Sequence, residues 1–128
     1  MKVNRNREKN IYFTVRINTY IMEIYMERNY YGKLKVKVTA NGCGIPLSGA
    51  CIYINGKRFV VPQDNNGFSD VITLFEAKEK GIKRTFTVKA ECDGFDSMIC
   101  RKVPVRSGYL TFYNIPLSKV KESQKILK

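Results

Sequence analysis

Histidine and tryptophan are absent from this sequence, and acidic residues are scarce: Asp and Glu total 11, against 23 Lys and Arg. Without histidine there is no Ser–His or Cys–His nucleophile pair and no zinc site of the usual His-containing kind. No two carboxylates fall in a motif typical of paired acid–base catalysis. The composition therefore predicts a protein that is not an enzyme, with no cofactor and no metal site.

A C-x-x-C motif is also missing. Cys43, Cys51, Cys92 and Cys100 are separated by seven, forty and seven residues, which argues against a zinc ribbon or a thioredoxin-type site. Four cysteines allow three pairings, and all three stay open. Cys92 and Cys100 flank a predicted turn, so they are the favoured pair if the protein is oxidised.

A long apolar run is lacking as well. The stretch that follows the charged first ten residues is interrupted by Arg16, Asn18 and Glu23, so neither a signal peptide nor a membrane span is predicted. We expect cytoplasmic synthesis with reduced thiols, followed by retention there or release by lysis within a particle. Met22 and Met26 are alternative translation starts to Met1, and the choice stays open.

What the sequence does contain is a β pattern. Its 128 residues suit one core, and alternating apolar positions recur between turn signals such as Asn55-Gly56. We predict an all-β fold: a seven-stranded Greek-key-type β-sandwich over residues 32–118, with a basic N-terminal extension and arm over 1–31 and a basic tail over 119–128. The predicted core comprises Leu34, Val36, Val38, Ala50, Ile52, Ile54, Val71, Phe86, Val88, Ala90, Val103, Val105, Ile115 and Leu117.

The arm has its own apolar face. Ile11, Phe13, Val15 and Ile17 alternate with polar or tyrosine positions, which predicts a strand over residues 11–18 that pairs with a sheet. Residues 20–28 fit a strand or a helix.

Near the other end of the chain, Leu110 and Phe112 face outward if Tyr113, Ile115 and Leu117 face the core. Outward apolar residues need a cover. The arm could supply it from the same chain or from a neighbouring subunit, unless the strand register is shifted by one residue.

The net charge of +12 favours polyanion partners, although a soluble lysine-rich surface has the same composition. Lys33, Lys35 and Lys37 repeat along one strand face at roughly 6.6–6.8 Å. They suit a track for a polyanion, or protect a sheet face or edge from aggregation. Basic pairs in or near turns add candidate contacts. They are Lys57 with Arg58, Lys83 with Arg84, and Arg101 with Lys102. No pattern of specific nucleic-acid recognition is present.

The segment Asp64–Gly67 is either a turn or a ligand-holding loop. Asp64 can accept backbone N–H groups and Gly67 can take positive φ, which favours the turn. A calcium loop requires several alternating oxygen ligands and a closing acid, and Asp70 is the only nearby acid.

In chain order, GKLKVKV, PLSGACIYI, DNNGF, FTVKAECDGF, VPVRSG and NIPL resemble the transthyretin-like fold, in particular the carboxypeptidase regulatory-like domain, over about residues 32–118. The hydroxyisourate hydrolases of that fold use histidines and a Y-R-G-S-type C-terminus, which this chain lacks. The resemblance therefore implies a non-catalytic structural module, a subunit of a phage-tail-like or cell-wall-associated assembly. The alternative is a module that binds an anionic cell-wall polymer such as teichoic acid.

Overall fold

The computed structural model describes the backbone of residues 10–17 and 20–121, and the side chains of residues 28–121. These ranges contain strands and no helix, so no helix is present that would span a membrane. The strands are β1 (Asn10–Ile17), β2 (Tyr20–Glu27), β3 (Tyr30–Ala40), β4 (Cys51–Ile54), β5 (Lys57–Val60), β6 (Ile72–Ala77), β7 (Lys83–Glu91), β8 (Met98–Arg106) and β9 (Tyr109–Leu117).

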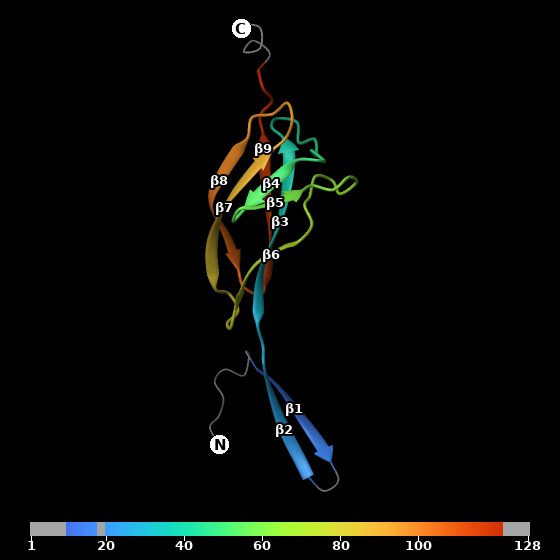
Figure 1. Cartoon of the computed structure of the whole chain (residues 1–128), viewed down its shortest axis with the longest axis vertical. Helices are drawn as coiled ribbons and strands as arrows, with labels where there is room; N and C mark the ends of the chain where they lie inside the picture. Colours follow the sequence, from blue (N-terminus) through green and yellow to red (C-terminus); the bar gives the residue numbers. More distant parts are fainter. Residues whose placement is uncertain (1–9, 18–19, 122–128) are drawn as a thin grey trace.

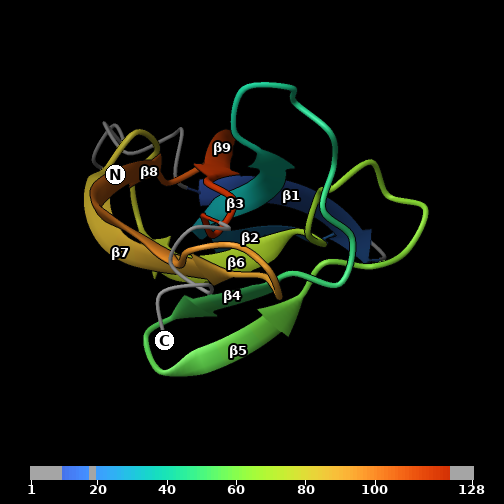
Figure 2. The ribbon, with the colours of Figure 1, turned by 90° about the horizontal axis from the view of Figure 1, so that it is seen from above.

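Seven of these strands form a sandwich of two open sheets. One sheet has three strands in the order β6-β3-β9, and the other has four in the order β5-β4-β7-β8. Viewed along the long axis, β4 and β5 lie in one layer, with β3 and β9 across from them (Figure 2). The predicted all-β sandwich is confirmed. One feature is non-local: β3 pairs with β9 in parallel, from Gly32↔Tyr109 to Ala40↔Leu117.

The core lies between the two sheets. Strand alternation puts one residue in two inward, and Leu34, Val36 and Val38 are fully buried on β3. The predicted core is confirmed except at Phe86, which is partly buried beside it, and at Val71. The buried apolar residues that were not predicted are Val61, Ile72 and Phe75.

The prediction that Val71 belongs to the core is wrong, because Val71 precedes the strand. β6 runs from Ile72 to Ala77. Ser69 is 1% exposed and occupies an inward position, where its Oγ accepts from Val36 N at 3.0 Å and donates to Asp70 O at 2.8 Å. The inward positions are therefore displaced: Val71 is 47% exposed, and Ile72 is 5% exposed.

Gly32 explains how the large ring of Phe75 enters the core. A Cβ at Gly32 would overlap that ring, so only glycine leaves room for it on β3. The ring also stacks on Phe86, with centroids 5.9 Å apart. The pairing of β3 with β6 shifts register next to this glycine, between Gly32 and Lys33.

The first two strands form a separate hairpin. The predicted strand near residues 11–18 is confirmed as β1, and the ambiguous segment after it is strand β2. The two pair only with each other among the described strands, and the hairpin extends beyond one end of the sandwich (Figure 1). Of the two alternatives for the arm, pairing with a sheet of its own sandwich is therefore not what the structure shows, and pairing with a neighbouring subunit stays a prediction. β1 and β2 are adjacent in the chain, so the short connection between them closes at a low cost in chain entropy.

The first residues of the predicted basic tail, together with Ser118, are hydrogen-bonded to the sandwich. Asp96 N donates to Ser118 O at 2.8 Å, and Val120 N donates to Gly94 O at 3.0 Å. These bonds attach residues 118–120 to the turn between β7 and β8. Residues 122–128 of the predicted tail lie outside the described residues.

Candidate functional site

The outer face of the three-stranded sheet is a basic and aromatic surface. The parallel register puts Lys33 beside Leu110, Lys35 beside Phe112, and Lys37 beside Asn114. Leu110 is 40% exposed and Phe112 is 61% exposed, so their predicted outward orientation is confirmed. They are not covered by β1, which was the in-chain alternative.

Phe68 organises this surface, and no sequence pattern predicted it. The ring lies 5.3 Å from Lys35 Nζ and 5.1 Å from Lys37 Nζ, and it meets Phe112 edge-on with centroids 6.0 Å apart. One isolated bridge, Lys37↔Phe68, brings it alongside β3. We name the surface made by Lys33, Lys35, Lys37, Phe68 and Phe112 the basic-aromatic face.

The position of β3 removes one explanation for its lysines. Lysine on an edge strand prevents edge-to-edge aggregation. However, β3 lies between β6 and β9 and is not an edge. Protection of an edge therefore does not account for Lys33, Lys35 and Lys37. One edge strand of this sheet is β9, which presents Leu110 and Phe112.

The other predicted basic residues do not join this face. Lys57 and Arg58 lie on β5, and Lys83 and Arg84 begin β7, so all four belong to the four-stranded sheet. β5 is one edge of that sheet, and β8, which carries Arg101 and Lys102, is the other edge. The predicted contacts therefore divide into separate surfaces, because the pairs lie on strands rather than in one cluster of turns.

The register of the hairpin defines a second candidate surface. The cross-strand pairs on one face are Ile11↔Met26, Phe13↔Ile24, Val15↔Met22 and Ile17↔Tyr20. Residues directly opposite each other in an antiparallel pair share a face. The four predicted arm residues thus lie on one face with three apolar residues and a tyrosine. Sequence reasoning found only the β1 half of this apolar hairpin face.

The cysteines are unpaired in the structure. The favoured pairing of Cys92 with Cys100 is wrong, because Cys100 lies opposite Val88 across the β7–β8 ladder. Cys92 is four residues further along, about 13 Å at strand spacing. A disulfide requires Cα atoms within about 7 Å. Burial, with Asp93 and Cys51 nearby, raises the pKa of the Cys92 thiol and disfavours its reactive thiolate.

Arg58, one of the predicted polyanion contacts, is hydrogen-bonded to the side chain of Cys51. Its Nη2 donates to Cys51 Sγ at 3.3 Å, and this bond raises the pKa of the guanidinium. The surrounding pocket, of about 790 Å³, is also lined by Glu91, Asp93 and Asp96. Its mixed charges do not select an anionic ligand.

The segment Asp64–Gly67 is a turn packed on β3. Asp64, Asn66 and Gly67 have positive φ, and Asn65 Nδ2 donates to Phe68 O at 2.8 Å. A Cβ at Gly67 would lie 2.8 Å from Val38 O, so the turn requires glycine there. Over the part of the chain with described side chains, no group of three potential metal ligands occurs.

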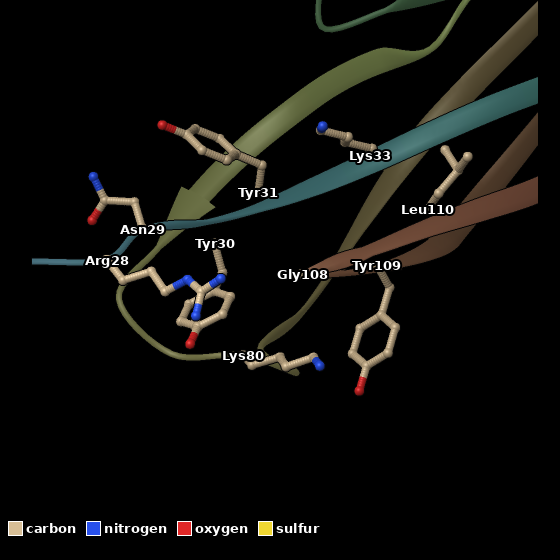
Figure 3. Close-up of a pocket in the computed structure, with 9 residues that line it drawn as sticks. All are labelled: Arg28, Asn29, Tyr30, Tyr31, Lys33, Lys80, Gly108, Tyr109 and Leu110. Atoms are coloured by element: carbon tan, nitrogen blue, oxygen red, sulfur yellow. The ribbon is translucent and has the colours of Figure 1, made fainter. Parts of the chain in front are cut away.

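A pocket of about 460 Å³ lies at the end of the sandwich where the chain arrives from the hairpin. Figure 3 shows Arg28 and Lys80 on the same side of β3 as Tyr30 and Tyr109. The residues that line this pocket are Arg28, Asn29, Tyr30, Tyr31, Lys33, Lys80, Gly108, Tyr109 and Leu110. Apart from Lys33 and Leu110, sequence reasoning missed these residues, because they come from three separate segments.

Comparisons with known proteins add no identity: no family model matches the chain, and no curated protein matches it.

Proposed function

We propose that this protein is a non-catalytic interaction module that joins a multi-subunit assembly through its N-terminal hairpin and the exposed sheet edge at β9. The observation that carries the proposal is the apolar hairpin face, defined by the pairing of Ile11, Phe13, Val15 and Ile17 with β2. An isolated two-stranded hairpin is at best marginally stable in water. Such a face therefore favours a partner surface.

The energetics of burial support docking. Each large apolar side chain that becomes fully buried contributes roughly 1.5–3 kcal/mol before ordering costs. Four to eight such side chains suffice to hold a subunit in an assembly. The exposed Leu110 and Phe112 on β9 offer an apolar surface of the kind that such a face would meet. A hairpin on one copy and a β9 surface on the next would give head-to-tail contacts.

The architecture supports a finer assignment, which we also propose: the sandwich is of the transthyretin-like, carboxypeptidase regulatory-like kind. Its support is the resemblance of the strand and turn motifs together with a seven-stranded arrangement in sheets of three and four. The setting suggested by that resemblance is a phage-tail-like particle or a cell-wall-associated structure. This part of the proposal rests on analogy of fold.

The test compares the two faces of the hairpin in the full chain. Phe13→Ser with Val15→Ser changes the apolar face, and Thr14→Ser with Arg16→Ser changes the other face. Sedimentation velocity should show self-association of the wild type and of the second variant, and its loss in the first. Equal association of both variants would refute docking through the apolar face.

A second candidate function is binding of an anionic polymer such as a teichoic acid on the basic-aromatic face. The observation favouring it is the convergence of Lys35 and Lys37 on Phe68, with Lys33 continuing the row. Added salt separates the two functions. Polyanion binding should weaken steeply from about 0.05 to about 0.5 M salt, whereas apolar docking should not. Replacing the three lysines by Gln should reduce polymer binding, and Lys57→Gln should serve as the control.

A further inference from the structure

The pocket at the hairpin end of the sandwich is lined by cations and tyrosines and by no acid. Arg28, Lys33 and Lys80 supply the charge, and Tyr30, Tyr31 and Tyr109 supply the rings. By contrast, the pocket around Arg58 has three carboxylates. In the part of the chain whose side chains are described, Lys89 forms an ion pair with Glu91, and no ion pair there involves Arg28, Lys33 or Lys80.

Two of the cations lie beside tyrosine rings on one side of β3. Arg28 Cζ is 5.8 Å from the Tyr30 ring centroid, and Lys80 Nζ is 5.2 Å from that of Tyr109. Figure 3 shows Lys33 on the other side of the β3 ribbon. The cation–π contacts restrain the side chains but leave their N–H donors for a ligand.

The loop that carries Lys80 is held by a buried serine. Ser107 is fully buried, and its Oγ donates to Glu79 O at 2.5 Å and accepts from Ile82 N at 2.9 Å. Gly81 N donates to Ser107 O at 2.8 Å. Three backbone groups around Lys80 are thus fixed, which reduces the ordering cost of ligand binding.

The segment that carries Arg28 is attached to the same loop. Lys78 Nζ donates to Asn29 Oδ1 at 3.0 Å, which joins the residue after Arg28 to the β6–β7 connection. Gly108 completes the packing: a Cβ there would lie 2.8 Å from Lys80 Cγ and 3.3 Å from Tyr30 Cδ1. Tyr30 and Lys80 therefore meet over a glycine whose lack of a side chain lets them approach, and Arg28 lies over the Tyr30 ring.

We propose that this pocket binds a tetrahedral oxyanion, a phosphate or sulfate group, between Arg28 and Lys80. The planar guanidinium suits two oxygens of such a group, the ammonium acts as a point charge, and the Tyr109 hydroxyl is a further donor. The pocket volume of about 460 Å³ exceeds that of the ion, so the pocket has room for a larger molecule that carries the group. This proposal does not rest on the proposed docking of the hairpin on another subunit.

Occupancy has a structural consequence. Arg28 follows directly after β2, and Lys80 belongs to the loop between β6 and β7. An anion that contacts both joins the base of the hairpin to the sandwich.

The experiment is a titration of the full ¹⁵N-labelled chain with inorganic phosphate at constant ionic strength, followed by amide chemical shifts. Shifts should concentrate at residues 28–31, 79–82 and 107–110. Arg28→Gln and Lys80→Gln should each weaken the affinity at least about fivefold, since each removes a charged hydrogen bond. Lys57→Gln, which removes the same charge on β5, should leave the affinity unchanged. Equal weakening by Lys57→Gln, or shifts spread over all basic surfaces, would overturn the site.

Linear polyphosphate identifies the source of the anion. If its affinity exceeds that of phosphate, and Lys35→Gln with Lys37→Gln removes only the excess, then the group belongs to a polymer that continues onto the basic-aromatic face. If polyphosphate binds no better than phosphate, the group belongs to a small molecule. If neither anion binds wild type more tightly than Lys80→Gln, the proposal fails.

Discussion

The sandwich and the hairpin use the same alternating pattern in different ways. On β3, Leu34, Val36 and Val38 are buried by the facing sheet of their own chain. On β1, the alternating residues Ile11, Phe13, Val15 and Ile17 share a face with β2 residues, but this two-stranded sheet has no second described sheet paired to it. Period two therefore predicts that a face is apolar, and it does not predict what covers that face.

The largest expected effect is on the free energy of unfolding, which a core substitution in the sandwich should lower much more than a substitution in the hairpin. Leu34→Ala should lower the free energy of unfolding by about 2–5 kcal/mol, because it leaves a cavity at a fully buried site. Phe13→Ala should change it by less than about 0.5 kcal/mol at a concentration where the chain is monomeric. Urea denaturation measures both. A loss at Phe13 comparable with that at Leu34 would mean that hairpin and sandwich unfold as one unit.

A smaller effect is expected where the sandwich supports the hairpin end. Ser107→Ala should cost about 1–3 kcal/mol, because Glu79 O and Ile82 N each lose a buried partner. The same denaturation experiment applies, with the exposed Ser97→Ala as its matched control. If Ser107→Ala behaves like Ser97→Ala, Ser107 does not hold the loop that carries Lys80.

The smallest effect concerns reactivity rather than stability. Burial raises the pKa of Cys92, so at a given pH less of it is thiolate than in an exposed cysteine. Alkylation of the native protein at about pH 8, near the ordinary cysteine pKa, should modify the exposed Cys43 before Cys92. Mass spectrometry of peptides gives the order, which should disappear in denaturant. Faster modification of Cys92 in the native state would contradict its burial.

The sequence predicted the sandwich well, because alternation and turn residues are local signals. It predicted the outward orientation of Leu110 and Phe112 on β9 and the burial of Ile115 and Leu117 on the same strand. It failed at Val71, because the inward turn of Ser69 depends on hydrogen bonds to β3 and to Asp70 that no local pattern records.

The candidate sites were only partly predictable for the same reason. The row of Lys33, Lys35 and Lys37 follows from strand period, but their contact with Phe68 arises from a bridge between distant segments. Arg28 and Lys80 approach the same pocket from segments far apart in the sequence. β2 was missed as the partner of β1 because its residues fit both helical and strand periods.

Sedimentation velocity of the full chain beside a version that lacks residues 1–27 tests the central claim most directly. If the hairpin docks on a neighbouring copy, the full chain should associate with increasing concentration. The shortened chain should be a folded monomer with an unchanged melting temperature, because β1 and β2 form a two-stranded sheet apart from the two sheets of the sandwich. If the shortened chain keeps the same association state as the full chain, the hairpin does not join subunits.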